Sequence, residues 1–500
     1  MTRDLYDERP YTEHAYAETH PGRIAAVARL SGWTPPPVAT ARILELGCGR
    51  GGNLLPIAAG LPGATLVGVD GSSRQIDEAR QVADDAGISN VSFVRGRFED
   101  VELAEGSFDY VICHGVLSWI RETARPVLLG RMAGALSDNG LACVSFNVLP
   151  GWYERLAARD WLRFSASLGQ RVEDAGASLA WLGAQLAPEH ADARGHLAAV
   201  ARRLDETGPA YAFHEYLAPE HHPLLVGAFL DEASAAGMSY LGDAVPATTS
   251  LDLLPSEARE RARALAPAAA QQLLDFVRCT AFRRALLVRA DAARTAAWQT
   301  SPDLQPAAIR RLRLASRLRP RDSRVPGARQ EAFTDGDVVV QVSDPPTRRA
   351  LHELASVAPR ALGFDDLARR ALLADATETA QSSLASELFD LWIAAGGLDL
   401  YDHDPAVTSR AGERPVACPV ARWHAQHGGV VTNRLHQEVL IPDTIVRWVL
   451  ARLDGTRTRQ DLAREARALD GNGAVSDVEL EQLVEASVDR LTACGLLVQA

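Results

Sequence analysis

Between residues 41 and 147 the chain alternates short apolar runs with longer segments in which apolar positions recur every three or four residues. The apolar runs predict strands over 42–46, 65–70, 91–94, 108–113 and 141–147, the last preceded by a turn at 138–140. The longer segments predict helices over 52–59, 73–86 and 124–136. Strands that alternate with helices are typical of a parallel, doubly wound α/β sheet, which binds ligands beyond the carboxyl ends of its strands.

Two helical insertions are predicted within the same sheet. Residues 152–208 are rich in alanine, leucine and arginine with helical spacing, and residues 255–278 show a second pattern of this kind. A helix over 223–237 precedes an apolar run over 238–242, and another run follows over 282–289. These two runs bring the total to seven strands. The prediction is a seven-stranded Rossmann-like sheet that extends over residues 1–290.

The C-terminal part of the chain contains a weak internal repeat. Residues 366–371 are similar to 461–466, and residues 394–400 are similar to 492–498. Each copy predicts helices followed by a glycine turn into an apolar strand, an order that suits a winged helix. We expect a linker over 291–330 and two mainly α, winged-helix-like domains over 331–405 and 406–500. Neither domain has the dense basic helix of a DNA-binding protein, which favours docking of a protein or peptide.

Composition and charge exclude several classes of protein. The formal net charge of −12 argues against a general nucleic-acid binder, and 47% hydrophobic with 23% charged residues is normal for a soluble globular chain. The six cysteines lack C-x-x-C spacing, which predicts reduced thiols and no metal site. The first residues lack the apolar segment of a signal peptide, and no apolar run reaches membrane-spanning length. We therefore expect a cytoplasmic protein without a membrane or nucleic-acid partner.

The chain contains no lysine, so all 52 of its basic residues are arginine. Codon bias towards arginine and alanine is the simpler interpretation of this composition. The alternative interpretation is that an enzyme that modifies lysine avoids modifying itself. Composition alone leaves both interpretations open.

The glycine-rich turn after the first strand is the most informative motif. Gly47, Gly49 and Gly52 satisfy the G-x-G-x-x-G pattern of dinucleotide-binding proteins, whereas Glu45, Gly47, Gly49 and Gly51 form E-x-G-x-G-x-G. NAD would place a pyrophosphate at the N-terminus of the following helix, where backbone N–H groups favour anions. S-adenosylmethionine carries a sulfonium and an amino-acid end instead, and a carboxylate such as Glu45 suits these groups. The motif therefore favours S-adenosylmethionine over NAD.

Several further segments resemble one family, the class I S-adenosylmethionine-dependent methyltransferases with an attached methyltransferase regulatory domain. This family includes the lysine methyltransferases that modify bacterial outer-membrane proteins. The resemblance rests on the turn and on residues 16–23, 114–119, 147–152, 213–217, 272–276 and 431–436. It implies a sheet that ends in an antiparallel pair of strands, and methyl transfer from S-adenosylmethionine with S-adenosylhomocysteine as the product. The resemblance leaves the acceptor open among proteins, peptides and small molecules.

The second strand ends in Asp70, where a carboxylate can accept hydrogen bonds from both hydroxyls of a ribose. The expected cofactor-binding residues are Glu45, Gly47, Gly49, Gly51, Asn53, Asp70, Gly71, Ser72, Arg97, Phe98, His114 and Gly115. By position, Arg97 and Phe98 should lie near the adenine. His114 follows the fourth strand and should lie beneath the sulfonium.

Aromatic and polar residues near the same strand ends are candidates for the acceptor side. The expected substrate-binding residues are Tyr11, Tyr16, Trp119, Asn147 and Trp152, and the expected catalytic residues are His20, His114, His214 and Glu215. A paired His214 and Glu215 can deprotonate an amine, because a carboxylate raises the basicity of an imidazole, although a structural pair is equally consistent with the sequence. His20 precedes a proline and either caps a helix or acts in catalysis.

These features predict methyl transfer to an amine of a protein or peptide, most simply a lysine side chain. The alternative is a natural-product methyltransferase that acts on a small molecule or a ribosomal peptide, because residues 428–500 resemble domains that bind leader peptides. The expected partners are a protein or peptide substrate, or a small-molecule acceptor. A homodimer is a further option.

Overall fold

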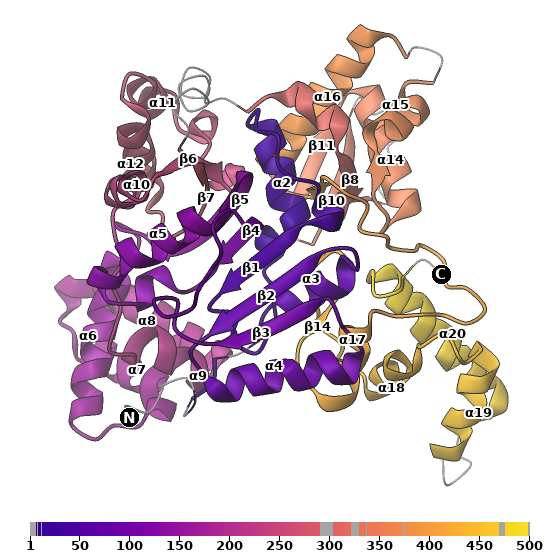
Figure 1. Ribbon diagram of the computed structural model, residues 1–500, viewed down its shortest axis with the longest axis horizontal. Helices are drawn as coiled ribbons and strands as arrows, with labels where there is room; N and C mark the ends of the chain where they lie inside the picture. Colours follow the sequence, from indigo (N-terminus) through magenta and orange to yellow (C-terminus); the bar gives the residue numbers. More distant parts are fainter. Residues whose placement is uncertain are drawn as a thin grey trace.

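The computed structural model describes residues 7, 9–11, 13–290, 304–321, 330–336, 338–373, 376–469 and 476–498 of the chain. A central sheet with helices on both faces is flanked by an inserted helical unit and by a C-terminal region in two parts (Figure 1). None of the helices in the described ranges combines the length and apolar character that crossing a membrane requires.

The central sheet has seven strands in the order β3-β2-β1-β4-β5-β7-β6. Their bounds are β1 Arg42–Leu46, β2 Thr65–Asp70, β3 Val91–Arg95, β4 Phe108–Cys113, β5 Leu136–Asn147, β6 Met238–Asp243 and β7 Phe282–Arg289. Neighbouring strands are parallel except that β7 runs antiparallel to both β5 and β6. The predicted Rossmann-like α/β sheet with a final antiparallel pair is confirmed.

One local prediction about this sheet was wrong. Residues 138–140 were expected to form a turn before the fifth strand, but β5 begins at Leu136 and includes them. The irregularity appears instead in the pairing with β4, where the register shifts between Phe108 and Tyr110. Asp138 and Asn139 are exposed at the start of the strand, and residues typical of turns are tolerated there.

Alternate residues of the strands face two separate apolar cores. Ile43 and Leu66 belong to the first core, and Leu44 and Val69 belong to the second. The covering helices are α2 Pro21–Leu30, α3 Leu54–Gly60 and α4 Ser73–Ala86 on the first face, and α5 Arg125–Ala135 and α10 Val226–Ala235 on the second. Burial on both faces is typical of parallel sheets, and it holds the carboxyl ends of the strands at one edge.

The first predicted insertion forms a small helical unit. Its elements are α6 Tyr153–Ser167, α7 Ala175–Gln185, α8 Ala191–Thr207, α9 Pro209–Ala212 and the π-helical turn η7 Phe213–Leu217. Its apolar residues form a core of their own, which includes Ala158, Leu179 and Ala212. The second insertion consists of α11 Ser256–Arg263 and α12 Pro267–Arg278. Figure 1 shows these two groups of helices at separate places beside the sheet.

The antiparallel end of the sheet contains a buried ion cluster. Arg283 on β7 places one guanidinium nitrogen 3.0 Å from Oδ2 of Asp243 on β6 and another 2.8 Å from Oδ1 of Asp275 on α12. All three side chains are buried, and burial raises the pKa of both carboxyl groups. One guanidinium thus holds two carboxylates and ties α12 to β6 and β7.

Part of the predicted linker belongs to a folded unit. β8 Arg313–Ser316 is the central strand of a sheet, between β12 Leu362–Gly363 and β13 Leu398–Tyr401. The linker prediction overlooked the apolar residues among the arginines, since Leu312, Leu314 and Leu318 are all buried. The other elements of this middle unit are β9 Arg319–Pro320, β10 Glu331–Asp335, β11 Val338–Val342, α14 Pro345–Val357, α15 Phe364–Leu372 and α16 Glu378–Ala395. Residues 291–303 and 322–329 of the predicted linker lie outside the described residues.

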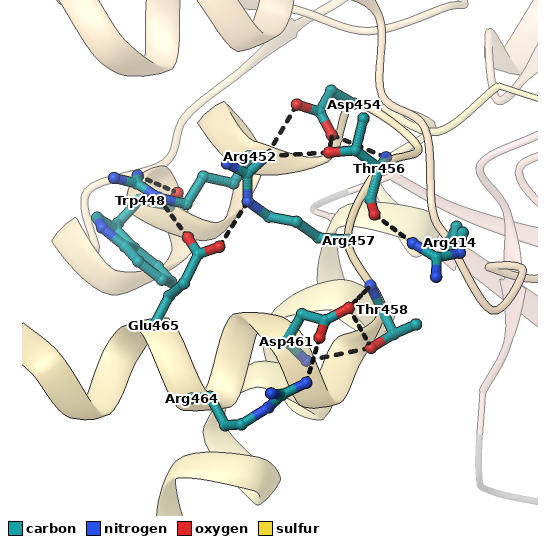
Figure 2. A network of polar contacts seen from close by, with 10 residues as sticks. All are labelled: Arg414, Trp448, Arg452, Asp454, Thr456, Arg457, Thr458, Asp461, Arg464 and Glu465. Atoms are coloured by element: carbon teal, nitrogen blue, oxygen red, sulfur yellow. Dashed lines mark hydrogen bonds and ion pairs between the residues drawn. The ribbon is translucent and has the colours of Figure 1, made fainter.

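The last unit packs directly on the sheet domain. Its elements are α17 Pro419–His427, β14 Val431–Thr432, β15 Glu438–Val439, α18 Thr444–Arg452, α19 Arg459–Leu469 and α20 Asp477–Ala493. α17 contacts α3 and α4, and the apolar residues of this unit join the first core of the sheet. Figure 2 shows the turn between α18 and α19, where Arg457 bridges Asp454 and Glu465. Thr458 and Asp461 exchange hydrogen bonds at the start of α19, as in a capping box.

The sequence repeat corresponds to equivalent elements of the last two units. Its first segment lies in α15 and in α19, and its second segment begins at the ends of α16 and α20. Gly396 and Gly495 follow those helices with φ angles of 75° and 74°. A left-handed residue that ends a helix is usually glycine, because other side chains are strained there. The repeat therefore corresponds to the same kind of glycine-terminated helix end at α16 and at α20.

Candidate functional site

A cavity of about 570 Å³ lies at the carboxyl edge of the sheet, between the strand-end loops, the N-terminal segment and the inserted helical unit. The predicted site residues that line it are Tyr11, Tyr16, Glu45, Gly47, Gly49, Asn53, Asp70, Gly71, Arg97, Phe98, His114, Gly115, Trp119, Asn147, His214 and Glu215. The cavity thus lies at the edge of the sheet where the strand order predicts ligand binding.

The glycine-rich turn between β1 and α3 requires its glycines. Gly47 has a φ of +77°, and a Cβ atom there would lie 2.4 Å from Cγ2 of Val116. Gly49 has a φ of +54°, and its Cβ atom would lie 2.9 Å from Oε1 of Gln75. Without side chains at these positions, the backbone of the turn itself forms the cavity wall.

Asp70 connects the two loops that form the floor of the cavity. Its Oδ2 accepts the N–H of Gly49 and its Oδ1 accepts the N–H of Ser72, each at 2.9 Å. Each carboxylate oxygen can accept more than one hydrogen bond, so acceptor capacity remains for a ligand. Ser72 itself does not line the cavity. Its hydroxyl caps α4 by accepting the N–H of Gln75.

Glu45 is a buried carboxyl group with an unused acceptor. Its Oε1 accepts a hydrogen bond of 2.8 Å from Nδ2 of Asn53, and its Oε2 has no hydrogen-bond partner. Burial raises the pKa of Glu45 to about 8, and the hydrogen bond from Asn53 opposes this rise. A buried oxygen without a partner is costly unless a ligand supplies a donor, so Glu45 indicates a donor-bearing ligand group at this end of the cavity.

Asn53 links the turn to the C-terminal unit. Its Oδ1 accepts the N–H of Tyr16 at 3.0 Å and the ring N–H of His436 at 2.8 Å. His436 lies between β14 and β15, and its burial lowers its pKa to about 3, so the ring is neutral. The nearby Arg434 donates to the carbonyl oxygens of Ala59 and Gly60 at the end of α3. The loop between β14 and β15 therefore contacts both ends of α3. His436 contacts Asn53 at the start of the helix, and Arg434 contacts the carbonyl oxygens at its end.

The N-terminal segment lies over the opening of the turn. The ring of Tyr16 lies 3.8 Å from that of His114, centroid to centroid, and Tyr11 contacts His214 at 5.2 Å. His14 and the backbone N–H of residue 15 both donate to Oε1 of Glu438 on β15. Burial lowers the pKa of His114 to about 3, so this residue is a neutral aromatic wall rather than a proton donor at neutral pH.

The inserted unit forms another part of the cavity wall, here called the acceptor end. Arg155 of α6, Arg203 of α8, Tyr211 of α9 and Glu215 of η7 line it together. Burial raises the pKa of Glu215 to about 7, although neighbouring arginines oppose the rise. This carboxyl group therefore changes its protonation state near neutral pH, which suits a general base.

The predicted pairing of His214 with Glu215 was wrong. The ring nitrogen Nε2 of His214 lies 2.7 Å from the carbonyl oxygen of Arg9 and donates to it. Burial also lowers the pKa of His214, so its imidazole is made less basic rather than more basic. Both residues line the cavity, but only Glu215 has the raised pKa of a candidate base there.

Three further predicted residues lie outside the cavity lining. His20 caps α2, since its Nδ1 accepts the N–H of Gly22, and its ring stacks on His403. Gly51 keeps space for Leu55 and Phe93, which would lie within 3.1 Å of a Cβ atom there. The geometry gives these two residues structural roles.

Trp152 is the third of these residues. It is buried and packs 4.2 Å from the ring of His221, which in turn lies 3.0 Å from Nδ2 of Asn147. His221 was not among the predicted site residues. It supports the wall from behind, between Trp119 and Trp152.

Three family models match separate parts of the chain. Residues 43–140 match a methyltransferase domain, residues 208–289 match a predicted methyltransferase regulatory domain, and residues 413–489 match the C-terminal winged helix domain of PKMT. The first range contains the glycine-rich turn, Asp70 and His114. The second contains Glu215 and the Arg283 cluster, and the third contains His436.

Two curated relatives and one solved protein are similar to long stretches of the chain. An uncharacterized protein of Rickettsia prowazekii (strain Madrid E) is 33% identical over 291 residues, which are 57% of this chain and 53% of the relative. A second uncharacterized protein of that organism is 32% identical over 216 residues, which are 42% of this chain and 86% of the relative. The chain thus spans about half the length of the first relative and most of the second.

The structure of PKMT2 from Rickettsia typhi is similar to this chain with a TM-score of 0.84 and 24% identity, and it covers 98% of this chain and 100% of that one. The same protein in complex with AdoHcy gives a TM-score of 0.85 at 23% identity and the same coverage. The likeness shows that the fold is shared over nearly the whole chain.

Proposed function

The chain belongs to the class I S-adenosylmethionine-dependent methyltransferases that carry a methyltransferase regulatory domain and a C-terminal winged-helix domain, and on this premise we propose that it methylates an amine of a protein or peptide, most simply a lysine side chain. The observation that carries the proposal is one cavity lined by both the glycine-rich turn and Glu215. The chain has no lysine of its own that would compete as an acceptor.

The turn end of the cavity fits S-adenosylmethionine by its chemistry. An ammonium group beside Glu45 would favour its ionised form, whose unpartnered Oε2 would then accept a hydrogen bond, and Asp70 offers carboxylate oxygens to ribose hydroxyls. Arg97 and Phe98 would lie beside the adenine. When bound, the cofactor supplies an electrophilic methyl group on a sulfonium.

The chain's own residues would align the acceptor and remove its proton. Tyr16 and His114 form an aromatic wall that excludes water, which is the main requirement of an in-line displacement. A lysine ammonium has an ordinary pKa of about 10.4, so it must lose a proton before its nitrogen can attack. The Glu215 carboxylate would accept that proton, since a base with a pKa near the working pH is most effective.

Glu215→Gln should lower kcat/KM at pH 8 by about 100-fold, the lower end of the usual range for removal of a general base. In the unaltered protein kcat/KM should rise with pH through about 7, because Glu215 accepts a proton only after losing its own. The variant should lose this rise. Glu220→Gln is the matched control, since the Glu220 side chain is 43% exposed and pairs with His222 instead. A variant that keeps both rate and pH profile would exclude Glu215 as the base.

His436→Ala should weaken binding of S-adenosylhomocysteine by about fivefold, since one hydrogen bond to Asn53 is lost and one is worth about 1 kcal/mol. His436→Gln, which keeps an N–H donor, should recover part of the affinity. Titration calorimetry measures both, with His427→Ala as the control because His427 lies away from the cavity on α17. Unchanged affinity in His436→Ala would show that the loop does not support the turn.

The proposed function is tested by incubating the protein with S-adenosylmethionine and, in parallel, with a proteome and a small-molecule extract of the host. Intact-mass spectrometry then detects methyl additions on polypeptides, and fragmentation locates the residue. Methylation of lysine in a polypeptide is expected. Labelling confined to small molecules would favour the natural-product alternative and exclude the proposal.

A further inference from the structure

At the acceptor end of the cavity, the charges of Arg155, Arg159 and Arg203 all act on the single carboxyl group of Glu215. The arginines of the lining are Arg50, Arg97, Arg155, Arg203 and Arg284, and its acids are Glu13, Glu45, Asp70, Glu99 and Glu215. Arg50 pairs with Glu78 and Arg97 pairs with Glu99. The remaining three arginines take part in none of the ion pairs recorded for the described residues. This stands out in a chain whose formal net charge is −12.

Each of the three remaining arginines lies over an aromatic ring. The guanidinium carbon of Arg155 is 5.3 Å from the Trp152 ring centroid, and that of Arg203 is 5.7 Å from the Tyr211 ring centroid. Arg284 stands 4.8 Å from the ring centroid of Phe282. A ring beneath a guanidinium fixes its plane, and the guanidinium has five N–H donors, so Arg203, which also donates to the Tyr211 side chain, keeps donors for a carboxylate.

Glu215 cannot neutralise this end by itself. Its pKa of about 7 means that it carries only part of a negative charge at neutral pH. The neighbouring Arg159 is already used, since it donates to the carbonyl oxygens of Glu215 and Ala218. An ammonium group that enters alone would therefore meet a net positive wall, and like charges in a partly buried site repel strongly.

From this arrangement we infer that Arg155 and Arg203 select an acceptor whose amine is flanked by a carboxylate, so that the preferred substrate is an acidic segment with Asp or Glu beside the methylated residue. The inference rests on the proposed function, because it specifies the sequence around the acceptor amine. The two arginines lie on α6 and α8 of the inserted unit and line the cavity. The acceptor carboxylate pairs with the guanidinium edges while its amine faces Glu215.

The test compares two peptides that differ only beside a central lysine, one with aspartate on both sides and one with asparagine. The aspartate peptide should have about tenfold higher kcat/KM, the factor expected for one charge-assisted hydrogen-bonded pair. In the Arg155→Gln/Arg203→Gln double variant the ratio of the two values should fall to about one. The ratio is the readout because loss of the arginines also alters Glu215, and that effect is common to both peptides.

Arg171→Gln is the matched control, because Arg171 belongs to the same unit, is exposed and pairs with Glu173. It should keep the tenfold ratio. Equal kcat/KM for the two peptides, or a ratio that survives in the double variant, would overturn the inference while methyl transfer to polypeptides still stood. If neither peptide is methylated, titration calorimetry with S-adenosylhomocysteine present measures the affinity of each peptide instead. Equal affinity for the two peptides, or no binding of either, overturns the inference.

Discussion

Asp70→Ala should weaken binding of S-adenosylhomocysteine by about 100-fold. The carboxylate accepts the backbone N–H groups of Gly49 and Ser72, so its removal releases both loops of the cavity floor. The variant also loses its hydrogen bonds to the ribose. Hydrogen bonds to a charged group are worth about 1.5–3 kcal/mol each, and 2.7 kcal/mol corresponds to about 100-fold in affinity. Titration calorimetry measures this effect without an acceptor.

One control variant and one stability measurement show whether the effect is specific to Asp70. Asp77→Ala on α4 removes a carboxylate whose side chain is 74% exposed and pairs with Arg80, so it should leave affinity within twofold. Thermal unfolding of Asp70→Ala in the absence of ligand shows whether the fold is retained. An affinity within threefold of the unaltered protein, with the fold intact, would mean that Asp70 only supports the loops and that the ribose lies elsewhere.

Arg283→Met should cost about 3–5 kcal/mol of unfolding free energy, the usual result when one partner of a buried ion pair is removed. The substitution leaves the carboxyl groups of Asp243 and Asp275 buried without their guanidinium. The cost should be smaller at pH 5 than at pH 7, because burial already raises both pKa values and protonation removes the uncompensated charges. Urea unfolding at the two pH values measures the difference.

The control for this prediction is Arg289→Met on the same strand. Arg289 is 37% exposed and lies 3.5 Å from the exposed Asp138, and surface pairs of this kind contribute about 0–1 kcal/mol. The triple variant with Asp243→Asn and Asp275→Asn in addition to Arg283→Met should recover part of the loss. A loss of less than 1 kcal/mol in Arg283→Met would show that the cluster is not what ties α12 to the sheet.

The sheet could be predicted from sequence because each of its signals is local. β1, β2, β4 and β7 begin and end at the predicted residues, since apolar runs bounded by polar or glycine residues define strands without knowledge of partners. The residues that follow these strand ends then predict most of the cavity lining around the glycine-rich turn. The 138–140 turn failed because β5 already begins at Leu136, and residues 137–140 lie in the register shift between its pairs with Phe108 and Tyr110 of β4.

The acceptor side could not be predicted in the same way. Arg155 and Arg203 occupy ordinary positions of amphipathic helices, and nothing in their spacing shows that a π-helical turn brings Glu215 between them. His436 meets Asn53 across 383 positions of sequence, and no periodicity reports a contact of that range. For His20, the sequence was consistent with two roles, and only the hydrogen bond from Gly22 distinguishes the cap from a catalytic group.

The contact between Asn53 and His436 also bears on how the protein is made. The glycine-rich turn emerges from a ribosome 383 residues before His436, the residue that completes the hydrogen bonds of Asn53. At about 5–20 residues per second, the nascent sheet domain waits tens of seconds for that partner. A nascent chain that stops before residue 431 thus contains every motif of the turn without the loop that braces it. Cofactor binding to such a chain would be weaker than to a chain that includes this loop, so methyl transfer would be delayed until residues 431–439 have emerged.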